Sequence, residues 1–178
     1  MDDLELAQNG DNQAFARLIE PLKVKIYKTG MAILKNDDDT CDAIQETLES
    51  AYKNLKSLNE AKYFSTWIIR IMVNKCYDII RKNKKVAYIN EKMQVEDNGY
   101  YEMYCQESEL EMVLNKIDND LRTVVVLYYY DDLSVTQVSE ILNIPEGTVK
   151  SRLARARDKI YKILKMEEGD LDWIKIVI

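Results

Sequence analysis

The chain of 178 residues contains no histidine. Histidine is the side chain that most often acts as a general base and most often ligates zinc, so its absence removes common routes to catalysis. The five glycines lie far apart, and no glycine-rich loop that could bind phosphate is present. Catalysis by carboxylates alone is not excluded, but no pattern favours it. We therefore expect a protein that is not an enzyme and that binds no cofactor and no metal.

Glycine and proline are scarce, which argues against an all-β protein because such proteins need many turns. The sequence has five glycines and two prolines, whereas 47% of its residues are hydrophobic. Leu, Ile, Glu, Lys and Ala recur in long periodic stretches, a pattern that is typical of helices. The hydrophobic content is sufficient for one domain or two small ones, each with its own core.

Long apolar runs are also lacking, so the sequence predicts no membrane span. The acidic beginning, MDDLELAQNGD, is unlike a signal peptide or a transit peptide. The three cysteines, Cys41, Cys76 and Cys105, are far apart and have no CxxC spacing. They are expected to be free thiols in a reducing cytosol, and the protein is therefore expected to be cytoplasmic.

Acidic residues outnumber basic residues in the chain as a whole, but the basic residues are concentrated in two segments. The formal net charge is −6. Residues 70–85 nevertheless hold six cations and one acid, and residues 145–165 hold seven cations and two acids, so each segment has a net charge of +5. Between them, residues 86–109 hold one lysine and six acids, a net charge of −5. The sequence thus predicts two basic patches separated by an acidic connector.

Hydrophobic periodicity predicts a first helical block from about residue 11 to residue 85. Apolar residues recur at helical spacing over 11–35, where Pro21 can kink the helix. The acidic segment NDDD can cap the next helix, because short carboxylates accept hydrogen bonds from the first backbone N–H groups. Two further helices are expected at 39–55 and at 64–81.

The second block is expected to contain four helices, at 110–117, 120–130, 135–142 and 146–164. Between the blocks, residues 86–109 lose the periodicity, are acidic and tyrosine-rich, and contain Asn-Gly. These features indicate a linker. The apolar end, residues 171–178 with the sequence LDWIKIVI, fits a strand-like tail and a segment packed on the last helix equally well.

The segment from Ser134 to Ile160 has the pattern of a helix-turn-helix. Ser134 followed by Gln137 matches a capping box. Asn143 tolerates the left-handed conformation of a sharp turn, and Pro145 suits the first position of the next helix. In that helix the apolar residues face inward, and the outward residues are Thr148, Lys150, Ser151, Arg152 and Arg155. Two short helices of this kind, the second basic on its outer face, predict a DNA-reading motif.

A cationic run by itself would more often be a solvated helix surface, but three motifs occur here in order. ILNIPEGTVKSRLARAR resembles the promoter-reading motif of bacterial sigma factors of the extracytoplasmic-function (ECF) group, and alone it also resembles the DNA-binding domains of some response regulators. CDAIQETLESAY resembles the helix by which sigma factors dock on the clamp helices of RNA polymerase. YFSTWIIRIMVNKCYDIIRKNKK is similar to the segment that melts and reads the −10 promoter element. The motifs cover about residues 11–165, without room for the additional domains of housekeeping sigma factors.

This resemblance implies an all-α fold of two small helical domains joined by a flexible acidic linker, the second ending in the helix-turn-helix. Residues 1–85 would dock on core polymerase and melt the −10 element, residues 86–109 would form the linker, and residues 110–178 would recognise the −35 element. The implied function is transcription initiation, with core RNA polymerase and promoter DNA as partners. Because the group is commonly held inactive by an anti-sigma factor, such a partner is implied as well.

The resemblance also assigns three sets of site residues. Polymerase docking is assigned to Asp42, Gln45 and Glu46. Binding of the −10 element is assigned to Tyr63, Phe64, Ser65, Arg70, Asn74, Lys75 and Arg81. Binding of the −35 element is assigned to Thr148, Lys150, Ser151, Arg152, Ala154 and Arg155.

Some of these assignments carry alternatives. The amide of Asn74 offers a donor and an acceptor to a flipped-out base, which a Watson–Crick edge requires. Tyr63, Phe64 and Ser65 are expected to wall that pocket, although Phe64, like Trp67, fits a core position as well. Ala154 stands where some relatives carry a bulkier contact residue, which leaves the preferred upstream sequence open.

Two other classes of protein remain open on the sequence alone. A stand-alone helix-turn-helix repressor needs a duplex operator and usually a dimer, yet no heptad or extra helix offers a dimer face. A purely protein-binding adaptor would have no use for two basic helices. Binding to core RNA polymerase distinguishes these classes from a sigma factor.

Overall fold

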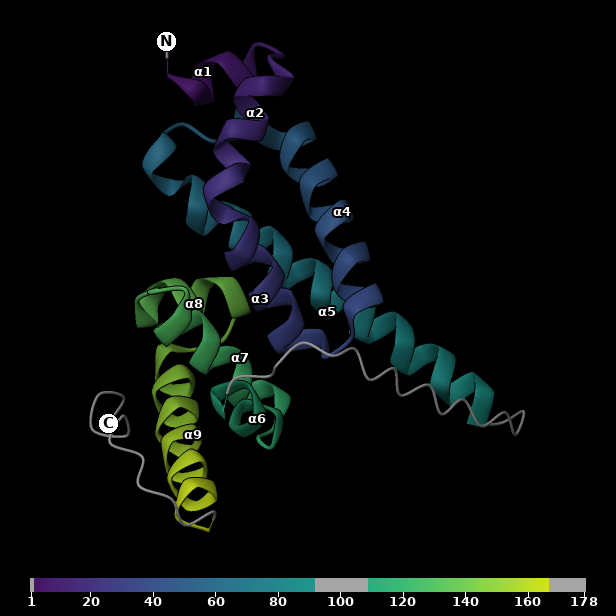
Figure 1. Cartoon of the computed structure of the whole chain (residues 1–178), viewed down its shortest axis with the longest axis vertical. Coiled ribbons are helices and arrows are strands. Elements are labelled where there is room, and N and C mark those ends of the chain that lie inside the picture. The colour runs from purple at the N-terminus through teal and green to yellow at the C-terminus, as the bar shows by residue number, and fades with distance from the viewer. Residues whose placement is uncertain (1, 92–108, 167–178) are drawn as a thin grey trace. The chain divides into compact units, whose positions relative to one another are not determined.

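The computed structural model describes residues 2–91 and 109–166 (Figure 1). Within these residues the regular secondary structure is helical and no strand occurs, which confirms the expected all-α fold. Contacts divide the chain into two units, one ending at Lys82 and the other beginning at Asn83. Most of the expected linker and the apolar segment 171–178 lie outside the described residues.

The first unit begins with α1 (Asp3–Gln8), a helix that the hydrophobic pattern did not predict. The side chain of Asp2 caps it by accepting a hydrogen bond from the backbone N–H of Glu5 at 2.8 Å. Asp11 caps α2 (Asn12–Ile19) in the same manner. Short carboxylates thus define the start of both helices, because they satisfy N–H groups that have no partner within the helix.

Pro21 interrupts the periodic segment where a kink was expected. It lies in a 3₁₀ turn, Glu20–Leu22, that separates α2 from α3 (Lys23–Leu34). Proline lacks a backbone N–H and is tolerated at the first positions of such a turn, where that N–H would have no helical partner.

The start of α4 (Asp37–Asn54) also follows the prediction. Lys35 ends the preceding helix with a φ of 56°, in the left-handed region. Asn36 then accepts a hydrogen bond from the backbone N–H of Asp39 at 2.8 Å. The acidic first turn of α4 adds a favourable interaction with the helix dipole.

Helix α5 (Phe64–Glu91) is longer than the sequence predicted. It follows two 3₁₀ turns, Leu55–Ser57 and Ala61–Tyr63. The prediction that this helix ends at Arg81 is wrong, because the helix continues to Glu91. Residues 86–91, which were expected to belong to the linker, are therefore helical. The physical reason is that the segment 82–91 contains neither glycine nor proline and includes several good helix formers, so its charge does not end the helix.

The core of the first unit is built around α5 and a close approach at Gly30. Five α5 residues are fully buried, namely Ile68, Ile69, Met72, Val73 and Cys76. A Cβ at Gly30 would meet Met72 Cε at 2.4 Å and Thr40 Cγ2 at 2.8 Å. Glycine therefore lets α3 approach its neighbours more closely than any other residue would.

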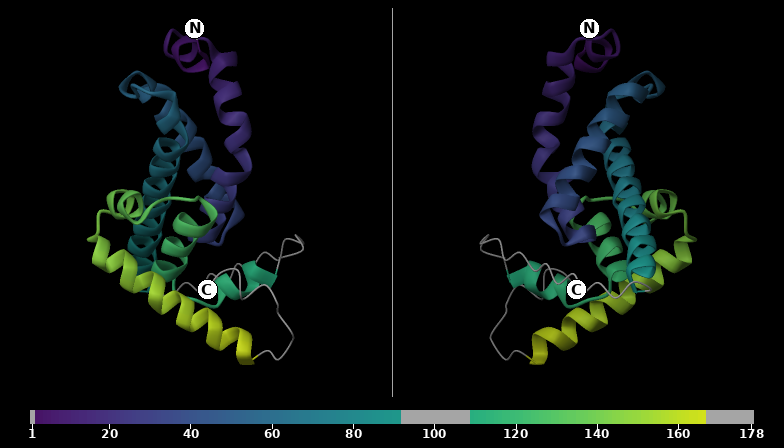
Figure 2. Two further views of the ribbon diagram at one scale, coloured as in Figure 1. Left: turned by 90° about the vertical axis from the view of Figure 1, so that its left-hand side faces the viewer. Right: turned by 90° about the vertical axis from the view of Figure 1, so that its right-hand side faces the viewer.

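The second unit contains α6 (Glu109–Asn115), α7 (Asn119–Val125), a π-helical segment (Val126–Tyr130), α8 (Val135–Leu142) and α9 (Glu146–Met166). The helix expected at 120–130 is thus divided into an α-helical and a π-helical part, and the last helix extends two residues beyond its expected end. Figure 2 shows α9 as one uninterrupted helix, against which α7 and α8 pack. None of the described helices has both the length and the apolar character that a membrane crossing requires.

Candidate nucleic-acid interface

Helix α8 begins and ends where the sequence predicts. Ser134 Oγ accepts a hydrogen bond from the backbone N–H of Gln137 at 3.2 Å, and Gln137 Oε1 accepts one from the backbone N–H of Ser134 at 2.8 Å. Asn143 ends the helix with φ 52° and ψ 48°. Ser139 Oγ donates to the carbonyl of Ile144 at 2.6 Å. The capping box and the left-handed turn are therefore both formed, and side chains hold each end of α8.

Helix α9 is fixed against α8 by one polar contact and an apolar face. Thr136 Oγ1 donates to Glu146 Oε1 at 2.7 Å, which links α8 to the first turn of α9. Val149 and Ala156 are fully buried, and Leu153 is nearly so. Because these residues recur at helical spacing, the opposite face of α9 is held in one orientation toward the surface.

The residues assigned to the −35 element lie on this outer face, but to different extents. Four of them are exposed, namely Lys150, Ser151, Ala154 and Arg155. Thr148 and Arg152 are only partly exposed, and the carbonyl of Thr148 accepts a hydrogen bond from Ser151 Oγ at 3.0 Å. The helix therefore presents two cations, a hydroxyl and a methyl group within about a turn and a half.

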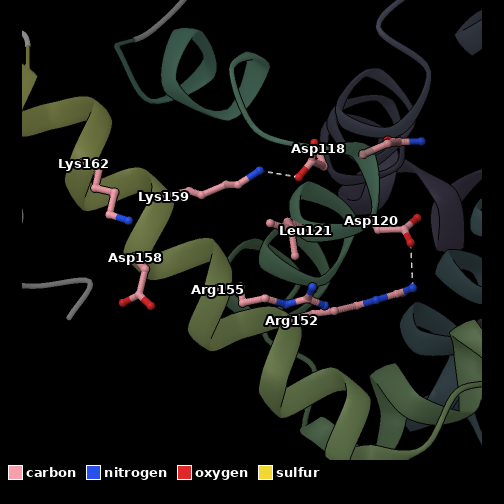
Figure 3. A pocket seen from close by; sticks show the side chains of 9 residues that line it. Asp118, Asp120, Leu121, Arg152, Arg155, Asp158, Lys159 and Lys162 are labelled. Carbon is pink, nitrogen blue, oxygen red and sulfur yellow. Dashed lines mark hydrogen bonds and ion pairs between the residues drawn. The ribbon is translucent and has the colours of Figure 1, made fainter.

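A cleft of about 560 Å³ lies between α9 and the beginning of α7 (Figure 3). Arg152 Nη2 forms an ion pair with Asp120 Oδ2 at 2.6 Å, and Lys159 Nζ forms one with Asp118 Oδ2 at 2.5 Å. The hydrogen bond from Lys159, and then its charge, lowers the pKa of the Asp118 carboxyl. Arg155 lines the same cleft but forms no ion pair among the described residues. Part of the cationic face is thus occupied by carboxylates of the chain itself.

Sequence reasoning missed Asp118 and Asp120. Arg152 was assigned to a DNA phosphate, whereas its side chain is only 20% exposed and faces Asp120, 32 positions earlier in the chain. No local pattern marks such a long-range partner. The only trace in the sequence is a pair of carboxylates at the start of α7, and that pattern is equally typical of a helix start.

The residues assigned to polymerase docking lie on α4 in two different environments. Asp42 and Gln45 are exposed and make no hydrogen bond through their side chains among the described residues. Glu46 is partly buried and bridges to α5: its Oε2 lies 3.2 Å from Lys75 Nζ, and its Oε1 lies 3.7 Å from Lys82 Nζ. Lys82 was not among the assigned residues. Glu46 therefore joins α4, the helix to which docking was assigned, to α5, the helix to which the −10 element was assigned.

The predicted base pocket at the start of α5 needs a correction at Phe64. This side chain is only 4% exposed and packs against Trp67, with ring centroids 6.0 Å apart, so it belongs to the core. Tyr63 is 51% exposed, and Lys62 Nζ lies 4.7 Å from its ring centroid. Ser65 is partly buried. Of the three residues expected to wall the pocket, Tyr63 is the one with an accessible aromatic ring.

Further along α5, the amide and the cations assigned to the −10 element differ in exposure. Arg70 and Asn74 are exposed one turn apart. Arg81 is exposed and forms an ion pair with Asp78, whereas the Lys75 side chain is 27% exposed. The described residues contain no group of three or more acidic or thiol side chains placed to hold a metal ion. The exposed amide and guanidinium groups on α5 can offer hydrogen bonds and positive charge, as a nucleic-acid strand requires.

Two family profiles match the chain, in the same order as the two units. The profile described as sigma-70 region 2 matches residues 18–86, and the profile described as sigma-70 region 4 matches residues 107–160. A curated relative, the ECF RNA polymerase sigma factor SigW of Bacillus subtilis, is 34% identical over 91% of this chain and 95% of its own length.

Solved structures support the fold. The sigma factor RpoE from Bartonella quintana, solved with the anti-sigma factor NepR, superposes with a TM-score of 0.71 at 21% identity, covering 86% of this chain and 98% of RpoE. CnrH, solved with the cytosolic domain of CnrY, gives a TM-score of 0.66 at 22% identity, covering 93% of this chain and 97% of CnrH. Because both region profiles match and the identity to SigW is 34% over most of both chains, the chain belongs to the ECF group of RNA polymerase sigma factors.

Proposed function

We propose that this sigma factor brings core RNA polymerase to promoters through three separate surfaces. The exposed polar residues of α4 dock on the polymerase, the exposed face of α5 binds the opened −10 element, and the outer face of α9 reads the −35 element. The first unit thus performs docking and melting, and the second performs upstream recognition. In this role the protein works in the cytoplasm and acts by binding rather than as an enzyme.

The outer face of α9 is the observation that carries this proposal. Lys150 and Arg155 are exposed on a helix whose opposite face is buried and whose first turn is tied to α8. Long cationic side chains on such a helix can reach the acceptor edges of guanine in the major groove. A solvated surface helix would need neither the capped α8 nor the left-handed turn before it.

The first unit contributes a complementary surface for a single strand. The Asn74 amide can pair with the edge of an unstacked base, and the exposed ring of Tyr63 can stack on one. Arg70 and Arg81 supply positive charge for the phosphates. Phe64 supports this surface from the core, which replaces its expected role as a direct contact.

An anti-sigma factor is part of the proposed regulation. RpoE and CnrH, whose fold this chain shares, were solved in complex with the anti-sigma factor NepR and with the cytosolic domain of CnrY, respectively. We infer that this chain is likewise bound by a protein partner that blocks its access to polymerase. Added to the transcription assay below, such a partner would abolish product formation.

Transcription in vitro tests the proposed function. Purified core polymerase, the chain and templates selected from random promoter sequences should yield discrete transcripts that depend on the chain. The Asn74→Ala variant should reduce transcription from duplex templates more than from templates in which the −10 element is already unpaired. Transcripts of equal yield with and without the chain would contradict the proposal.

A further inference from the structure

The cleft between α7 and α9 places two carboxylates against two cations of the recognition helix (Figure 3). Asp120 and Asp118 lie at the beginning of α7, and they hold Arg152 at 2.6 Å and Lys159 at 2.5 Å. These two contacts are short, charge-assisted and formed between elements far apart in the sequence. They therefore reflect the packing of α7 on α9 rather than the proximity of neighbours along one helix.

A carboxylate and a DNA phosphate are alternative partners for the same cation. Both are anionic oxygen acceptors, and both bind the guanidinium group with similar geometry. Arg152 has the less accessible side chain of its pair, 20% exposed against 58% for Asp120. Arg152 can bind a phosphate through Nη2 only if it first breaks its ion pair with Asp120. Breaking this pair costs free energy, which lowers the net free energy gained from the phosphate contact.

The pairing is selective among the acids that line the cleft. Asp158 lies on α9 itself and lines the same cleft, yet it forms no ion pair among the described residues (Figure 3). Asp118 and Asp120 therefore have defined partners on α9 that Asp158 lacks. Asp158 offers a matched control, because its replacement removes the same charge without breaking a pair.

We propose that Asp118 and Asp120 are internal competitors of DNA phosphate for Lys159 and Arg152, and that they restrain the recognition helix from binding arbitrary DNA. This inference rests on the proposed function, in which the outer face of α9 contacts the promoter. Binding of arbitrary duplex DNA depends on phosphate contacts, so a competitor for those cations weakens it directly. Base contacts and the polymerase then supply the additional binding energy that a promoter complex needs.

The variants Asp118→Asn and Asp120→Asn test the proposal in the full-length chain. Each keeps the shape of the side chain and removes its charge, and the Asp118 side chain makes no capping hydrogen bond that would be lost. The readout is the dissociation constant for a duplex without promoter sequence over a series of salt concentrations. Circular dichroism confirms that the helix content is unchanged.

Each replacement should tighten binding about 2- to 5-fold, the range expected when one exposed ion pair no longer competes. The slope of the logarithm of the affinity against the logarithm of salt concentration should become steeper by up to about 0.9 for each released cation. Asp158→Asn should change both quantities less. Equal effects of all three replacements, no change in either quantity, or no binding by any variant would overturn the proposal.

A double-mutant cycle separates this inference from the proposed function. In the background of Arg152→Ala, the replacement Asp120→Asn should lose its effect, because the competitor then has no cation to hold. If Arg152→Ala weakens binding but Asp120→Asn does not tighten it, the competition is disproved while the DNA-binding face stands. If Arg152→Ala leaves binding unchanged even in the background of Asp120→Asn, where the competitor is removed, Arg152 does not contact DNA and the assigned face is wrong at this position as well.

Discussion

Arg155 and Lys162 both project from α9, line the same cleft and form no ion pair among the described residues. They differ in position, because Arg155 lies beside the buried Leu153 in the first half of the helix, where we propose that bases are contacted. Arg155→Ala should therefore cost about 1–3 kcal/mol of discrimination between promoter and altered −35 sequences. The measurement is the ratio of holoenzyme affinities for the two DNAs.

Lys162→Ala provides the control for this prediction, since it removes the same charge two turns further along. Its effect should be small and nearly independent of DNA sequence, as expected for a phosphate contact. Equal loss of discrimination in the two variants would show that only the total charge of α9 matters.

The cysteines give a second prediction at the residue scale. Burial raises the pKa of the Cys76 thiol to about 12, and Cys76 is fully buried in the core. Cys41 is exposed, and desolvation, followed by the charges of nearby aspartates, raises the pKa of its thiol as well. Only the thiolate reacts with iodoacetamide. In the folded chain, labelling of Cys41 should rise as the pH is raised from 7 to 9, whereas Cys76 should stay unlabelled.

The raised pKa of the Cys76 thiol also makes the stability of the folded chain depend on pH. Since the folded-state pKa of Cys76 lies above the ordinary value of 9.0, its contribution to stability is present below about pH 9 and is lost as the pH rises toward 12.

Peptide mass spectrometry measures the labelling of each cysteine, and unfolding in denaturant should make Cys76 reactive. Comparable labelling of both thiols in the native chain would contradict the burial of Cys76.

At the scale of the elements, Gly30 determines how closely α3 packs. An alanine there gains up to about 1 kcal/mol of helix propensity. Its Cβ would, however, overlap the buried Met72 and Thr40, and overpacking of this kind costs about 1–3 kcal/mol. Gly30→Ala should lower the free energy of unfolding by about 1–2 kcal/mol, measured by urea unfolding.

Gly147, in the first turn of α9, is the matched control. A Cβ at Gly147 would meet no atom within 4 Å, so Gly147→Ala should keep or raise the stability. A Gly30→Ala variant as stable as Gly147→Ala would show that α3 can move away from its neighbours without cost.

The exposed face of α4 carries the docking prediction. Asp42 and Gln45 make no internal hydrogen bond among the described residues, whereas Glu46 is held by Lys75 and Lys82. Replacing Asp42 and Gln45 by Ala should preserve helicity, because Ala is the best helix former. Loss of a charge-assisted hydrogen bond, about 1.5–3 kcal/mol, should weaken core polymerase binding about 10-fold or more.

Glu49→Ala is the control for α4, because it removes a carboxylate from the same helix that pairs with Lys53 four residues later. Its affinity for core polymerase should stay within about 2-fold of the native value, as an exposed pair contributes little. Equal weakening by Glu49→Ala would assign docking to the acidity of α4 as a whole.

The sequence predicted best those elements whose ends are defined by local chemistry. The capping box of Ser134 and the left-handed Asn143 define α8, and both could be recognised from residues within a few positions. The end of α5 could not be recognised, since the change from apolar to charged residues marks a change of exposure and not a break in the helix. The pair of Arg152 with Asp120 depends on the packing of α7 against α9, which no local pattern records.

For the whole molecule, the uneven distribution of charge explains how an acidic chain can serve DNA binding. The net charge of −6 disfavours binding of arbitrary DNA, while residues 145–165 lie in the second unit and most of residues 70–85, up to Lys82, lie in the first. Each segment alone holds only six or seven cations, and several of these already pair with acids of the chain. Productive binding therefore requires a partner that holds both segments at one promoter, and the family assigns this role to core polymerase.

The most direct test is whether the isolated chain forms a one-to-one complex with core RNA polymerase before any DNA is added. Analytical ultracentrifugation of the chain, of core polymerase and of their mixture measures this. We predict that the chain sediments as a monomer by itself and with the polymerase in the mixture, and that only the complex binds promoter DNA selectively. A chain that fails to bind core polymerase and instead binds a duplex operator as a dimer would contradict the account.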